Sequence, residues 1–163
     1  MLNSDGESLD EAAHYWRADR PLETGRLVFE KLRPEARVAW ALNILKLVIV
    51  KTGITHPAID RILLIGKNPE EWSDAHDANS AARDCALNLS RLTDRSPEQD
   101  LLLSNLMLAY FVARLIYNAT GPADPFDEDN GWYIASSLKQ LVDIVGDDEF
   151  SKLSLSALLK LQP

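Results

Sequence analysis

The stretch PEARVAWALNILKLVIVKT, residues 34–52, decides the fold. Its apolar residues cover most of the circumference of a helix, which is typical of a helix that its neighbours bury on several sides. Pro34 and Glu35 suit a first helical turn, and Gly53 suits the left-handed residue that ends a helix. We therefore expect a helix over residues 34–52 at the centre of the molecule.

Further amphipathic segments of helical period lie on both sides of this helix, and none shows the alternation of a strand. Two segments have clear starts, because Asn68 precedes Pro69 and Ser96 precedes Pro97, with Gln99 completing a capping box. Besides the central helix, the sequence predicts helices over about residues 9–20, 22–32, 57–65, 68–93, 96–117, 131–145 and 147–161. We therefore expect an all-α fold, a compact bundle of about seven helices around a central apolar helix.

Length and composition are those of one domain, because 163 residues with 46% apolar content can bury a single core. We take residues 1–163 as one helical domain and expect the polar residues 1–7 to fray. Cys85 is the only cysteine, and residues 1–20 lack the basic start and apolar run of an export signal. The apolar stretch 38–50 is shorter than the roughly 20 residues of a membrane span. These features favour a cytoplasmic protein without a membrane span.

The charge is strongly negative and unevenly distributed. The formal net charge is -8, which disfavours a nucleic-acid partner because phosphates are bound by clustered Lys and Arg. Residues 121–150 hold eight acids and one cation, Lys139, which accounts for most of the imbalance.

The chain carries no motif of a catalytic, metal or cofactor site. A di-iron helical bundle needs two Glu-x-x-His motifs, and this sequence has one, from Glu11 to His14. His76 has no acid three or four residues away to orient it, and His56 precedes a proline in a turn. The acidic loop 127–131 has the wrong register for calcium. We therefore predict a non-catalytic protein without metal or cofactor.

The acid-rich segments on either side of the predicted helix 131–145 form the candidate functional site. Carboxylates beyond those that cap helices, beside aromatic side chains, are typical of a surface that attracts a basic protein partner. The candidate partner-binding residues are Asp127, Glu128, Asp129, Trp132, Tyr133, Asp147, Asp148 and Glu149. The helix between them is roughly 22 Å long. One continuous patch therefore requires the fold to bring residues 127–129 near another acidic turn.

A purely structural interpretation of these residues stays open. Asp129 would cap the helix that follows it. Asp147, Asp148 and Glu149 would occupy the first turn of the next helix, where the helix dipole favours carboxylates. The aromatic side chains would then belong to the core.

Residues 72–78 (WSDAHDA) and 127–133 (DEDNGWY) resemble segments of the small all-helical immunity proteins that bacteria pair with polymorphic toxins. The small size, acidity and helical content of the chain resemble those proteins as well. The resemblance implies a domain that binds a cognate toxin tightly and occludes its active site, with no chemistry of its own.

An alternative from a different class remains, a helical enzyme or small-ligand-binding bundle whose pocket is assembled from residues distant in sequence. A deep pocket that contains His14, His56 or His76 would favour this alternative. A flat acidic face would favour the interaction protein.

Overall fold

A computed structural model describes residues 4–121 and 127–163, without the side chains of residues 4–8, 127 and 128. All regular structure in these ranges is helical, as the sequence predicts. The elements are α1 (Ser4–Arg17), α2 (Pro21–Lys31), η1 (Pro34–Ala36), α3 (Arg37–Thr52), α4 (Pro57–Lys67), η2 (Pro69–Asp74), α5 (Ala75–Ser90), α6 (Pro97–Asn118), α7 (Asp127–Val145) and α8 (Asp148–Leu159), where η marks a 3-10 helix. Helix α1 begins inside the stretch expected to fray, and residues 1–3 lie outside the described residues.

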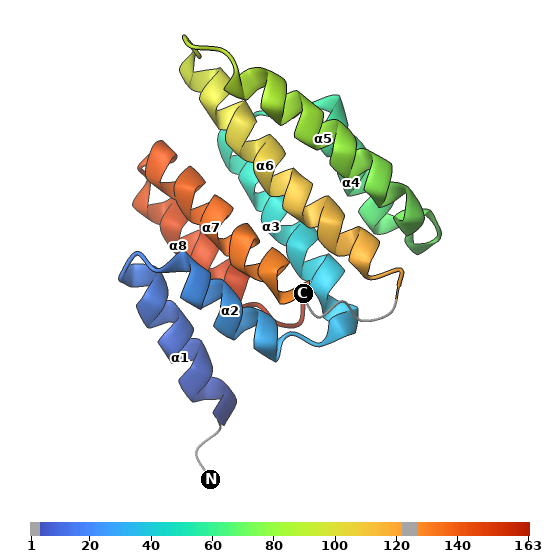
Figure 1. The fold of residues 1–163 in the computed structure, drawn as a ribbon. Coiled ribbons are helices and arrows are strands. Elements are labelled where there is room, and N and C mark those ends of the chain that lie inside the picture. Colours follow the sequence, from blue (N-terminus) through green and yellow to red (C-terminus); the bar gives the residue numbers. More distant parts are fainter. Residues whose placement is uncertain (1–3, 122–126) are drawn as a thin grey trace.

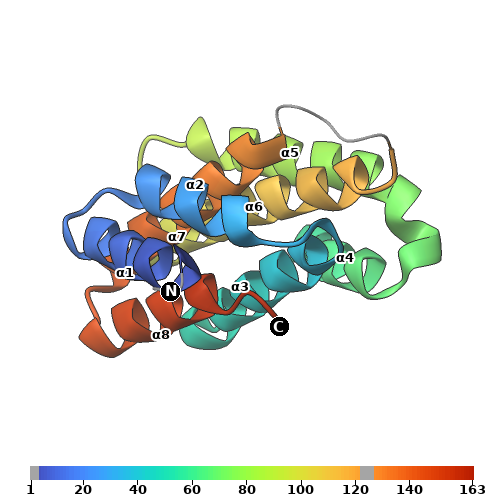
Figure 2. The same ribbon diagram turned by 90° about the horizontal axis from the view of Figure 1, so that it is seen from below.

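The helices form two layers (Figures 1 and 2). Helices α2, α7, α6 and α5 lie side by side in the first layer, and α8, α3 and α4 form the second. Helix α1 packs along α2 at one edge. Apolar side chains from both layers fill the space between them. The outer side of the first layer is covered by no described helix.

The central helix α3 is confirmed, with one change at its start. Trp40, Ile44 and Leu45 are fully buried, and Gly53 ends the helix in the left-handed conformation, with φ of 66°. The first turn, Pro34–Ala36, is a 3-10 helix. Helix α3 contacts α4, α6, α7 and α8, while α6 contacts α3, α4, α5 and α7. The two helices therefore share the centre of the bundle.

Helix α6 is long and apolar enough to cross a membrane by length and composition, with a mean hydropathy of 1.4. Its neighbours are helices on several sides, which is the packing of a core helix.

The two predicted helix starts have different outcomes. Ser96 and Gln99 form the expected capping box, with bonds of 3.1 and 2.9 Å. Asn68 does not cap a long helix, because its amide nitrogen donates to the carbonyl of Leu64 and to Glu71. The residues after Asn68 form the 3-10 helix η2, and α5 begins only at Ala75.

Helix α7 begins at Asp127, about one turn before the predicted start at residue 131. Gly131 lies inside the helix, and the ring of Phe29 packs directly against it. A Cβ at residue 131 would stand 2.5 Å from Cδ2 of that ring, so the close packing requires glycine here. Asp129 therefore belongs to the first turn of α7, and the expectation that it caps this helix is wrong.

Candidate functional site

The acidic candidate residues lie beyond or near the two ends of α7. This helix has 19 residues, so its ends are roughly 28 Å apart at 1.5 Å per residue. Asp129 lies near one end, and Asp147, Asp148 and Glu149 follow the other. The side chains of residues 127 and 128 lie outside the described residues.

Asp147 has a structural role at the start of α8. Its Oδ1 accepts a hydrogen bond of 2.9 Å from the backbone N–H of Glu149, and its carboxylate pairs with the ammonium of Lys51 on α3. The hydrogen bond from Lys51 holds the pKa of Asp147 below its usual range. Asp148 and Glu149 are exposed in the first turn, where the helix dipole favours them. These three residues therefore fit the capping interpretation, which leaves a further role for the two exposed ones open.

The two aromatic candidates point to different surroundings. Trp132 lines a hollow of 350 Å³ with Tyr15 and Arg20, and its buried indole N–H finds no hydrogen-bond partner among the described residues. Tyr133 is 43% exposed, and its ring stacks on Phe111 of α6 at 4.9 Å between centroids.

The outer side of the first layer, on α5, α6 and α7, exposes a set of large apolar side chains. We call this surface the outer face and define it by Leu87, Met107, Tyr117, Tyr133 and Ile144. Tyr133 and Ile144 are eleven residues apart, close to three helical turns, so they share one side of α7. A line of aromatic rings joins the helices, because Tyr110 contacts Phe111 at 5.0 Å and Phe111 stacks on Tyr133.

Two hollows lie between α5 and α6. The buried side chains of α5 are all alanines, at positions 75, 78, 82 and 86, so the backbones approach closely and larger side chains stand only at the flanks. The apolar hollow has a volume of 210 Å³, and its lining residues are Arg83, Ala86, Leu87, Ser90, Leu103, Met107 and Tyr110.

The second hollow is polar, and we call it the His76 pocket. It has a volume of 290 Å³, and its lining residues are His76, Asn79, Tyr110, Arg114, Tyr117 and Asn118. The ring of His76 contacts that of Tyr117 at 5.1 Å, and Asn79 Nδ2 donates to the carbonyl of Tyr110 at 2.8 Å. Tyr110 lines both hollows, so they form one groove along the helix pair.

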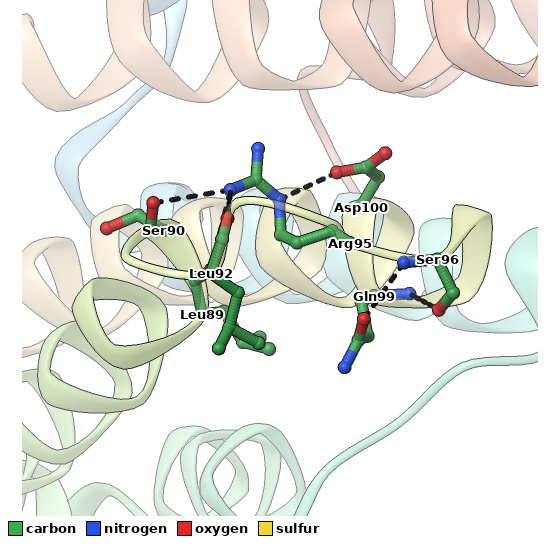
Figure 3. Close-up of polar contacts among 7 residues, drawn as sticks. All are labelled: Leu89, Ser90, Leu92, Arg95, Ser96, Gln99 and Asp100. Atoms are coloured by element: carbon green, nitrogen blue, oxygen red, sulfur yellow. Dashed lines mark hydrogen bonds and ion pairs between the residues drawn. The ribbon is translucent and has the colours of Figure 1, made fainter.

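Arg95 fixes the turn between α5 and α6 (Figure 3). Its Nε donates to Asp100 at 2.8 Å, and its Nη1 lies within hydrogen-bond distance of the last two carbonyls of α5 and of the Leu92 carbonyl just after the helix. The distances are 3.4 Å to Leu89, 3.3 Å to Ser90 and 3.0 Å to Leu92. This side chain therefore caps α5 and holds one end of the groove.

The three histidines have separate environments. His56 caps α4, since its Nδ1 accepts from the backbone N–H of Ala58 at 3.1 Å. His14 is exposed beside Tyr15. His76 lines the pocket described above. Within residues 4–121 and 127–163, no three His, Cys, Asp or Glu side chains lie close enough together to hold a metal ion.

A search of the sequence for acids and catalytic motifs does not find the groove. The sequence does contain a sign of it, a stripe of α6 residues at alternating spacings of four and three, which places their side chains on one side of the helix. The stripe consists of Leu103, Met107, Tyr110, Arg114 and Tyr117. Tyrosine, methionine and arginine in such a stripe suit a binding surface as well as a core.

No known protein family, curated protein or solved structure matches the chain. The function therefore has to be inferred from its own residues.

Proposed function

We propose that the chain is a non-catalytic protein-binding domain of the immunity-protein kind, which binds a basic toxin domain and covers its active surface. The observation that carries the proposal is the outer face, where five large apolar side chains are exposed on a layer that no described helix covers. Contiguous exposed apolar surface is typical of interaction sites. Tyrosine, methionine and arginine, which line its groove, are enriched at the centres of protein interfaces.

The negative charge supports a basic partner. A net charge of -8 attracts a basic protein over several ångströms and speeds association. Asp129 lies before Tyr133 along α7, and Asp148 and Glu149 lie beyond Ile144. Asp129, one turn before Tyr133, is therefore expected at the rim of the outer face, whereas Asp148 and Glu149 begin α8 in the second layer and would add to the overall negative charge.

A second candidate function, binding of a small ligand, is favoured by the His76 pocket. The pocket combines residues of two helices, as the alternative derived from the sequence requires. Ligand binding and partner binding are compatible. The His76 pocket adjoins the apolar hollow of the outer face, because Tyr110 lines both.

The first test uses the protein encoded by the reading frame next to this gene. We expect it to inhibit the growth of its host, and we expect co-expression of this chain to restore growth. We further expect the two purified proteins to form a stable complex in size-exclusion chromatography. If the neighbouring protein neither forms this complex nor is neutralised, the immunity function is wrong.

The second test locates the surface. We expect Leu87→Asp combined with Met107→Asp to weaken the complex by about 100-fold or more, because each substitution places a charge in the apolar hollow. The control pair is Val50→Asp with Leu64→Asp, at exposed apolar residues of α3 and α4 in the other layer. Isothermal titration calorimetry measures both. Equal losses for the two pairs would contradict the outer face as the docking surface.

A third variant tests the acidic residues predicted from the sequence. Changing Asp127, Glu128 and Asp129 to Lys reverses the charge at the start of α7. We expect slower association with the toxin, most strongly at low salt, with helical content unchanged. An unaltered affinity and association rate would remove these three residues from the site.

A further inference from the structure

We infer that the His76 pocket is a binding site for the phosphate group of a small phosphate monoester. The inference goes beyond the binding of a protein partner, and it rests on the second candidate function, small-ligand binding in this pocket, by naming the ligand class. It rests on the side chains that α5 and α6 bring together at this end of their groove.

Arg114 is the central group of the site. Its side chain is half-buried in the pocket wall, and no other described residue provides it with a hydrogen bond or an ion pair. Two other arginines are engaged, since Arg20 pairs with Glu23 and Arg95 with Asp100. An unpaired guanidinium beside a hollow offers its planar set of donors to two oxygens of one phosphate.

His76 and the tyrosines add donors and an aromatic wall. The rings of His76 and Tyr117 contact each other at 5.1 Å with a tilt of 59°. His76, Tyr110 and Tyr117 all line the hollow, and an imidazole and two tyrosine hydroxyls have N–H and O–H groups that can donate to phosphate oxygens. A phosphate accepts several such bonds at once, whereas a carboxylate offers fewer acceptor positions. This donor set therefore favours phosphate.

Asn79 is a fixed part of the wall. Its amide nitrogen donates to the backbone carbonyl of Tyr110 across the helix pair. This bond ties α5 to α6 beside the pocket, so the two helices that carry His76 and Arg114 are held together without a ligand.

One nearby carboxylate opposes an anion. Asp77 Oδ1 lies 3.9 Å from His76 Nδ1, but its side chain is 81% exposed and does not line the pocket. An exposed charge is strongly screened by water and salt. Arg114, within the wall, is therefore expected to dominate the interaction with a bound phosphate.

The volume limits the ligand. A hollow of 290 Å³ is at the small end of ligand pockets, so it holds a phosphate and little more than one ring. The expected ligand class is a phosphate monoester with a small aromatic or polar group that rests on the rings of His76 and Tyr117.

The experiment titrates the full chain, labelled with ¹⁵N, with inorganic phosphate, phenyl phosphate and phenol. We expect saturable shifts of the amide signals of residues 76–79 and 110–118 with both phosphates, with phenyl phosphate the tighter ligand. Phenol lacks the phosphate and is expected to produce no saturable shift. If the amide shifts saturate with neither inorganic phosphate nor phenyl phosphate at tens of millimolar ligand, the proposal is overturned.

Two variants locate the site. We expect Arg114→Gln to weaken phenyl phosphate binding at least tenfold and Arg114→Lys to weaken it less, because lysine keeps the charge and loses the planar donors. The control is Arg91→Gln, at an exposed arginine just after α5 that does not line the pocket. A circular dichroism melt shows that each variant is folded. Equal weakening by Arg114→Gln and Arg91→Gln would overturn the proposal, because it would show attraction by overall charge. The titration needs no toxin, so its result is independent of the test for the protein partner.

Discussion

The α2–α7 pair and the α5–α6 pair are both built on small residues, but their flanks differ. In α2–α7, Gly25 lies against Gly131, and the ring of Phe29 covers Gly131 on one flank. A hollow of 350 Å³ opens on this pair as well, where Trp132 meets side chains of α1 and α2. In α5–α6, alanines make the contact, and the larger side chains beside it leave two hollows open to solvent. Close approach of two helices therefore does not by itself seal their contact. In α2–α7 an aromatic ring covers the crossing itself, whereas no ring among the described residues covers the alanine contact of α5–α6 in the same way.

The largest expected effect comes from breaking the close crossing of α2 and α7 with Gly25→Ala. A Cβ at this position would lie 2.6 Å from the carbonyl oxygen of Gly131 and 2.9 Å from the Cβ of Ala135. Backbone atoms cannot move aside as a flexible side chain can, so the helices must separate. We expect the free energy of unfolding to fall by about 3 kcal/mol in urea denaturation, the upper end of the cost of overpacking.

The control for this variant is Gly121→Ala. No atom lies within 4 Å of a Cβ added there, so we expect stability to be unchanged or slightly higher, since alanine restricts the unfolded chain. A similar loss in both variants would mean that the close crossing of α2 and α7 is not the cause.

An intermediate effect is expected at the turn that holds the open pair. Arg95→Ala removes the hydrogen bonds to Asp100, to the last carbonyls of α5 and to the carbonyl of Leu92. We expect a loss of about 1–2 kcal/mol in the free energy of unfolding, since the donor is charged but partly exposed. Arg91→Ala, four residues earlier, is the control, with an expected change below about 0.5 kcal/mol. If Arg91→Ala destabilises as much, Arg95 does not fix the groove.

The smallest effect is expected at Asp147, in the turn between α7 and α8, outside both helix pairs. Asp147→Asn keeps a side-chain acceptor for the start of α8 and removes the ion pair with Lys51. We expect the Tm at neutral pH to fall slightly. Because the folded-state pKa of Asp147 lies below its ordinary value, its stabilisation is present above that ordinary value and is lost as the pH falls through the folded pKa.

The difference in Tm between the wild type and Asp147→Asn is therefore expected to shrink at acid pH. Asp148→Asn is the comparison variant, because it changes the same charge at the next residue without an ion pair in the described structure. A difference that grows on acidification would contradict the role given to Asp147.

Local sequence signals predicted much of the fold because they act within a few residues. The capping box of Ser96 and Gln99 and the left-handed Gly53 are examples, since each forms bonds within one turn. The start of α7 was misplaced because Gly131, which looks like a helix boundary, is needed for the contact with Phe29 on α2. That contact joins residues far apart in sequence.

The candidate site was predictable only in part for the same reason. The acids at the ends of α7 are visible in the sequence, and Asp147 has the capping role that one interpretation gave it. His76 seemed isolated because no acid stands at helical spacing from it. The packing of α5 on α6 gave it Arg114 and Tyr117 as neighbours in one pocket.

The sequence by itself determined that the chain is all helical, where most helices begin and end, and that its surface is acidic. Hydrophobic period, caps and charge are properties of neighbouring residues, so they are encoded locally. The tertiary structure alone decided which side chains cover each small-residue contact and where hollows remain beside it. That outcome depends on how side chains from distant helices fill or leave space between them, and on the outer face that remains once the two layers have packed.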